Sequence, residues 1–135
     1  LIKEYPIAGI EDPFGEDEQQ KWQALNGNLL VIGDDLTVTN TERINMVYKD
    51  NLCNGVIIKP NQIGTVSETI EAVKLAKSFN WKIIVSHRSG ETMDDFISDL
   101  AVGVSADFIK SGAPFPKERM AKYNRLLEIE KEINY

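Results

Sequence analysis

The feature that most constrains the fold is an alternation of short apolar runs with longer amphipathic stretches along the whole chain. The runs are rich in β-forming residues, and the stretches between them repeat apolar residues at three- and four-residue spacing. Strands that are apolar on both faces and alternate with helices indicate an α/β fold, with a parallel sheet joined by right-handed crossovers. The predicted strands are 6–10, 29–33, 55–58, 82–86 and 107–109, and the predicted helices are 17–26, 41–51, 66–79, 93–103 and 117–133.

The starts of two helices carry side chains that can cap them. Residues 39–42 and 65–68 both have the spacing of a capping box, in which a hydroxyl and a carboxylate satisfy backbone donors of the first turn. The pattern predicts helices that begin near Thr39 and Thr65. The last predicted helix is amphipathic and has a solvated polar face. Its predicted core side chains are Leu126, Leu127, Ile129 and Ile133.

A charged or titratable residue closes each apolar run. The spacings are 23, 25, 28 and 23 residues, so one such residue recurs per strand-helix unit, at the carboxyl end of the strand. α/β proteins build their sites at that edge, and a closed barrel brings all the carboxyl ends toward one axis. The pattern therefore favours a barrel, and because an eight-unit barrel needs about 200 residues, three strands are expected from elsewhere. The closing residues are Glu11, Asp34, Lys59, His87 with Arg88, and Lys110.

Composition narrows the class of partner and the compartment. A formal net charge of −6 argues against general binding to nucleic acid or to an anionic membrane. The single cysteine, Cys53, excludes an internal disulfide and indicates a reducing compartment. No apolar segment approaches the ~20 residues that span a bilayer, and the start lacks the pattern of a signal peptide. A cytoplasmic protein is predicted, and the first residues suggest that an upstream part is missing.

Glu11 and Asp34 place two carboxylates at adjacent strand ends. Mg²⁺ prefers oxygen ligands and commonly takes one or two carboxylates together with water and substrate oxygens, so a magnesium site is predicted. Asp12 and Asp35 double each carboxylate, and the first of each pair is preferred because it is nearest the strand end. The alternative is that these acids start loops and cap the segments that follow.

Lys59 stands at the end of a strand that is expected to be buried. Lysine is rarely placed there unless it is paired, and a desolvated or cation-flanked ammonium can lose its proton near neutral pH and so become a general base. The alternative is a structural ion pair of Lys59 with Glu11 or Asp34.

The segment after the fourth strand suits an anion. Arg88 offers a planar fork of donors, Ser89 adds a hydroxyl, and Gly90 lets backbone amides approach closely. Barrels often bind phosphate on the loops after strands seven and eight, and in that case Lys110 joins the site.

Arg88 and His87 in this segment could also have purely structural roles. Arg88 could pair with Glu91 or Asp94, and His87 could be a satisfied rim histidine. A nucleophilic Ser-His pair at Ser86 and His87 is rejected, because consecutive side chains leave an extended chain on opposite sides.

Five stretches resemble successive signatures of the enolase family, the phosphopyruvate hydratases, in the right order and at fitting spacings. The resemblance implies that residues 1–135 are the C-terminal five strand-helix units, strands four to eight, of an enolase-type (β/α)8 TIM-like barrel. Such a piece is incomplete on its own, and the N-terminal α+β domain and the first barrel strands are absent from it. The stretches are IEDPF, DDLTVTN, KPNQIGT, SHRSGET and IKSGAP.

The resemblance also implies roles for individual residues. Glu11 and Asp34 match Mg²⁺ ligands, and Lys59 matches the base that takes the proton from carbon 2 of 2-phosphoglycerate. The use of a lysine base with one or two Mg²⁺ ions is a known property of the enolase superfamily. A third metal carboxylate and the glutamate that assists hydroxide departure are expected upstream of the chain. Roles at the substrate are implied for Glu11, Lys59, His87, Arg88, Ser89 and Lys110, with His87 and Lys110 assisting Lys59 in catalysis.

The implied activity is that of a lyase, EC 4.2.1.11, which dehydrates 2-phosphoglycerate reversibly to phosphoenolpyruvate in glycolysis and gluconeogenesis. The isolated chain is expected to be inactive. For the full-length protein the resemblance implies a homodimer in the cytoplasm, with a cell-surface or secreted fraction as in the family. Two alternatives stay open: a non-catalytic surface or binding role of the fold, and another superfamily enzyme that acts on a non-phosphorylated carboxylate.

Overall fold

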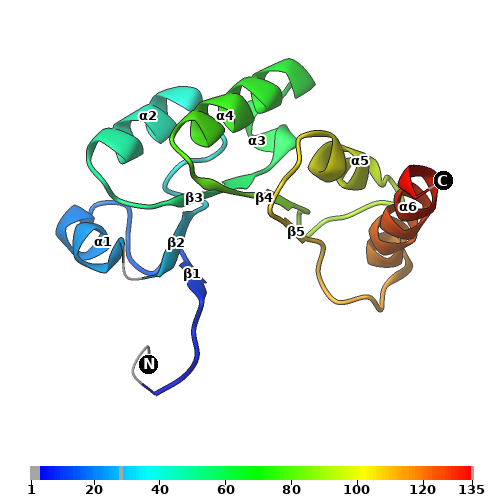
Figure 1. Ribbon diagram of the computed structural model, residues 1–135, viewed down its shortest axis with the longest axis horizontal. Coiled ribbons are helices and arrows are strands. Elements are labelled where there is room, and N and C mark those ends of the chain that lie inside the picture. Colours follow the sequence, from blue (N-terminus) through cyan, green and yellow to red (C-terminus); the bar gives the residue numbers. More distant parts are fainter. Residues whose placement is uncertain (1–3, 28, 135) are drawn as a thin grey trace. The chain divides into compact units, whose positions relative to one another are not determined.

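A computed structural model describes residues 4–27 and 29–134, and within them strands and helices alternate as predicted, apart from one additional short helix at residues 60–63 (Figure 1). The strands form one sheet in the order β1-β2-β3-β4-β5, and the pairs β1–β2, β2–β3 and β4–β5 are parallel. The predicted parallel α/β class is confirmed. The strands are β1 (Gly9–Glu11), β2 (Leu30–Gly33), β3 (Gly55–Ile58), β4 (Lys82–Ser86) and β5 (Phe108–Lys110). The helices are α1 (Gln19–Leu25), α2 (Thr41–Lys49), α3 (Pro60–Ile63), α4 (Val66–Ser78), α5 (Phe96–Gly103) and α6 (Lys117–Ile133).

The chain divides into two compact units, residues 1–83 and 84–135, with the boundary inside β4, and each unit is described by itself. In the first unit, all four residues of β3 are buried, and α2 and α4 lie side by side (Figure 1). Asn54 extends the pairing of β3 with β2, because its side chain accepts the N–H of Val31 at 2.8 Å and donates to the Leu29 carbonyl at 3.1 Å.

Cys53 lies directly before that pairing and is 2% exposed. Burial raises the pKa of its thiol to about 12, although backbone hydrogen bonds to Gly55 and Gly33 act in the opposite direction. The thiol is therefore a neutral part of the core, as expected for a free buried cysteine.

Of the two predicted capping boxes, only the hydroxyl cap at Thr65 is present, because the Glu68 carboxylate accepts the Thr65 hydroxyl rather than a backbone N–H. Thr65 caps α4, and its hydroxyl accepts the N–H of Glu68 at 3.2 Å. The prediction for α2 is wrong by one residue: Asn40 is the N-cap, and its side-chain oxygen accepts the N–H groups of Glu42 and Arg43. Thr39 does not cap the helix, because its hydroxyl accepts the N–H of Lys59 and donates to the side chain of Gln62.

In the second unit, α5 and α6 lie side by side (Figure 1), and Phe108 on β5 is 53% exposed. Ser98 on α5 donates its buried hydroxyl to the Lys122 carbonyl at 2.9 Å, and Arg125 on α6 makes a two-pronged ion pair with Asp99. These bonds fix α6 against α5.

The predicted core face of α6 is only partly right. Ile129 is buried, but Leu127 and Ile133 are 56% and 65% exposed. Lys122 is instead 1% exposed, and it pairs with Glu91 from the loop that joins β4 to α5. The helix therefore buries a charged side chain on the face that also carries the buried Ile129.

No helix among the described residues is long and apolar enough to cross a membrane.

The Glu91–Lys122 ion pair predicts a specific pH dependence of stability. Burial raises the pKa of Glu91, but the hydrogen bonds from Lys122 and from the Arg88 N–H outweigh it, so the net pKa lies below the usual 4.5. A depressed carboxyl pKa adds stability that is fully present above about pH 4.5 and is lost as the pH falls through the folded-state value.

We expect Glu91→Gln to lower the free energy of unfolding at pH 7 and to narrow its difference from the wild type toward pH 3. Urea unfolding at a series of pH values measures this difference. A difference that stays constant down to pH 3 would contradict the assigned ion pair.

Candidate functional site

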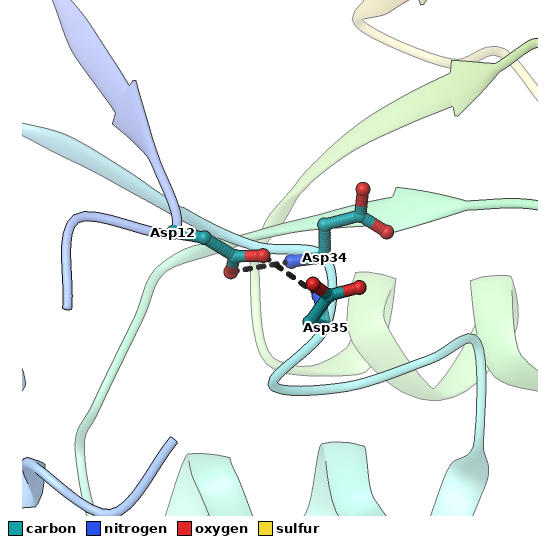
Figure 2. A group of neighbouring side chains, drawn as sticks. All are labelled: Asp12, Asp34 and Asp35. Carbon is teal, nitrogen blue, oxygen red and sulfur yellow. Dashed lines mark hydrogen bonds between the residues drawn. The ribbon is translucent and has the colours of Figure 1, made fainter. Parts of the chain in front are cut away.

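The turn after β1 is held to the turn after β2 by one carboxylate. Asp12 accepts the N–H of Asp34 at 2.9 Å with one oxygen and the N–H of Asp35 at 2.8 Å with the other (Figure 2). Its own N–H donates to the Ile32 carbonyl at 3.0 Å, and its φ is +39°. Burial raises the pKa of Asp12, while the two backbone donors lower it. Asp12 thus shapes the turn from which Asp34 projects.

Asp34 is buried and directs its carboxylate away from that of Asp12 (Figure 2). Its Oδ2 pairs with Lys59 Nζ. Its Oδ1 is buried and has no hydrogen-bond partner among the described residues. A buried acceptor without a partner is costly, and it is the kind of atom that a bound cation satisfies.

The donor set around Asp34 suits a hard cation. Asp12, Asp34 and Asp35 each bring a carboxylate oxygen within 4.8 Å of the others. Glu11 lies on the neighbouring strand, where the register pairs it with Ile32. Since side chains alternate along a strand, Asp34 falls on the same side as Ile32 and hence as Glu11. Carboxylate oxygens are the ligands that Mg²⁺ prefers, although, among the described residues, the carboxylates that lie within 4.8 Å of one another are those of Asp12, Asp34 and Asp35 and do not include the predicted ligand Glu11.

Lys59 follows the fully buried β3 and is fixed at both ends. Its N–H donates to the Thr39 hydroxyl at 2.9 Å, and that hydroxyl donates to Gln62 Oε1 at 2.8 Å. Its Nζ pairs with Asp34, and its side chain is 14% exposed. The sequence analysis gave a structural ion pair of Lys59 with Glu11 or Asp34 as the alternative to a general base. The structure contains this ion pair, and the partner is Asp34.

In the second unit, His87 and Lys110 meet through a backbone carbonyl. The Lys110 carbonyl lies 2.9 Å from the His87 backbone N and 2.7 Å from its Nδ1. Because a carbonyl only accepts hydrogen bonds, Nδ1 carries a proton. In the neutral ring, Nε2 is then an acceptor that can face a ligand.

Arg88 and Ser89 are exposed on the loop that follows β4. The backbone N–H of Arg88 donates to Glu91 Oε1 at 2.7 Å, and Glu91 Oε2 lies 2.5 Å from Lys122 Nζ. Within the described residues of this unit, the Arg88 guanidinium forms no ion pair with Glu91 or Asp94. Glu91 therefore shapes the loop and leaves the donors of Arg88 for an anion.

The roles that three side chains have in holding the site were not predicted from the sequence. Asp12 and Thr39 act on backbone N–H groups, and no spacing rule links them to those partners. Lys122 had a signal: it precedes Leu126 by four residues and Ile129 by seven, which places a lysine on the apolar stripe of its helix.

Comparison with known proteins identifies the family. The whole chain, residues 1–135, matches the family described as the enolase C-terminal TIM barrel domain. It is 51% identical to Enolase 1 of Entamoeba histolytica over 134 residues, which are 97% of this chain and 31% of that protein. The chain thus spans about a third of the length of this relative. It belongs to the enolase family.

Proposed function

We propose that the protein containing this chain is a magnesium-dependent lyase that interconverts 2-phosphoglycerate and phosphoenolpyruvate. The observation that carries the proposal is the buried Asp34, which has one carboxylate oxygen without a partner and the other on Lys59. A metal ligand and a proton acceptor are the two groups that such a reaction needs beside each other. Family membership supports the assignment.

Lys59 is the proposed proton acceptor. Its Nζ, as the neutral amine that is left once the ammonium has lost its proton, is to take the proton from carbon 2 of 2-phosphoglycerate. The Thr39 hydroxyl fixes the Lys59 backbone, and the Asp34 carboxylate fixes Nζ. The side chain is mostly buried, so little water competes for the nitrogen.

Glu11 and Asp34 are the proposed Mg²⁺ ligands from this chain. When bound, Mg²⁺ supplies positive charge that stabilises the second negative charge formed beside the substrate carboxylate. Asp34 Oδ1 is the atom best placed to accept it, because no hydrogen bond within the described residues has to be broken.

The second unit supplies the proposed phosphate ligands. The Arg88 fork and the Ser89 hydroxyl can donate to phosphate oxygens. His87 presents Nε2 to the substrate, because Nδ1 is held by the Lys110 carbonyl. The Lys110 ammonium adds positive charge for the developing anion.

We expect the isolated 135-residue chain to be inactive, because the third metal carboxylate and the acid for hydroxide departure are proposed to lie outside it. Assay of 2-phosphoglycerate turnover with Mg²⁺ on a chain of confirmed 15.2 kDa mass checks this. Robust turnover by that chain would show that it contains a complete site.

In the full-length protein, we expect Lys59→Ala to lower kcat by at least about 10³-fold, because the proton acceptor is removed. Mg²⁺ affinity, followed by calorimetry, should change little. Lys74→Ala, which removes an exposed lysine of α4, is the matched control and should retain full activity. Activity that survives Lys59→Ala would refute the base assignment.

Arg88 separates this reaction from that of a superfamily enzyme acting on a non-phosphorylated carboxylate. We expect Arg88→Gln to raise KM for 2-phosphoglycerate by about tenfold or more, because a charge-assisted phosphate contact is lost. Steady-state kinetics measure KM, with glycerate tested in parallel as the phosphate-free substrate. A better rate on glycerate than on 2-phosphoglycerate in the wild type would favour the other enzyme class.

A further inference from the structure

Lys122 is a buried lysine whose ammonium has no solvent contact to compensate its charge. It lies on α6 and is 1% exposed, yet each of its three ammonium N–H groups has an acceptor. Nζ donates to the Thr92 carbonyl at 2.7 Å and to the Glu118 carbonyl at 2.8 Å, and it pairs with Glu91 Oε2 at 2.5 Å. Two of these three partners belong to the loop between β4 and α5. Burial of an ammonium is costly unless it is fully paired, so this arrangement holds that loop in one position.

Glu91 links the buried lysine to the loop's exposed end. One carboxylate oxygen pairs with Lys122, and the other accepts the backbone N–H of Arg88 at 2.7 Å. The lowered pKa of Glu91 agrees with a carboxylate that stays ionised at neutral pH. A continuous path of charge-assisted bonds therefore runs from α6 through Glu91 to the backbone of Arg88.

The helix at the other end of this path is itself anchored. Ser98 donates to the Lys122 carbonyl at 2.9 Å, and Arg125 pairs with Asp99 at 2.7 Å. Tyr123, next to Lys122, donates its hydroxyl to the Gly112 carbonyl, two residues after Lys110. α6 thus holds both the loop after β4 and the segment after β5.

We propose that Lys122 and Glu91 are positioning residues, which hold loop 87–92 in the shape that presents Arg88 and Ser89 to the substrate phosphate. The inference rests on the proposed function, because it needs that loop to bind phosphate. Neither residue touches the substrate. Since phosphate contacts exist both before and during the reaction, their loss is expected in KM rather than in kcat.

The experiment compares two variants of the full-length protein, Lys122→Met and Glu91→Gln/Lys122→Met. Lys122→Met leaves the Glu91 charge buried without its partner and is expected to lower stability. The double variant removes both charges, and its unfolding temperature should recover much of that loss. In both variants we expect KM for 2-phosphoglycerate to rise about tenfold while kcat stays within about twofold of the wild type.

Two further readouts test the loop directly. Inorganic phosphate should inhibit both variants competitively, with an inhibition constant raised by the same factor as KM. Hydrogen exchange at the Arg88 amide should be faster, because its acceptor is no longer held. Lys131→Met is the matched control: it replaces an exposed lysine near the end of the same helix and should leave KM unchanged.

If the double variant recovers both the unfolding temperature and the KM of the wild type, the proposal is overturned. Lys122 would then contribute to stability without positioning the loop. A loss confined to kcat would overturn it as well. Arg88→Gln separates this failure from that of the proposed function. If Arg88→Gln raises KM and the Lys122 variants do not, phosphate binding by the loop stands and the positioning role falls. If the wild type does not turn over 2-phosphoglycerate, both fall.

Discussion

Parallel pairing of neighbouring strands is the constraint on which the rest of the structure depends. Within the first unit it aligns Glu11 with Ile32 and Ile32 with Gly55, and within the second it aligns Ser86 with Lys110. The residues that follow paired strands therefore reach the same edge. Backbone N–H groups beyond the last ladder bond need other acceptors. Asp12 supplies them after β2, and Thr39 supplies one after β3.

Most of the fold could be predicted from the sequence because it rests on local pattern. The bounds of β3 and β4 agree with the prediction, whereas β1 begins three residues later than predicted, since only Gly9–Glu11 pair with β2. The four-residue helix α3 was missed because it is too short to show a helical period. The capping box at Thr39 failed because a tertiary partner, the N–H of Lys59, takes the hydroxyl.

The candidate site could be predicted only in part. The charged residues at the strand ends follow from spacing, but the choice of which carboxylate projects and which binds backbone depends on the turn after each strand. Asp12 turns to the backbone at a φ of +39°, which no sequence pattern specifies. Lys122 was not predicted as a core residue because lysine is rarely buried, yet three acceptors offset the cost of its burial.

Cys53 makes the core of the first unit accessible to a chemical measurement. The thiol is 2% exposed and its pKa is about 12, so neither contact with solvent nor the reactive thiolate is available in the folded state. Its alkylation therefore has to wait for the strands around it to separate. Because the chain has no other cysteine, the rate at which a thiol reagent alkylates Cys53 reports the rate of local opening beside β3. The mass increase of the chain is enough to follow this reaction.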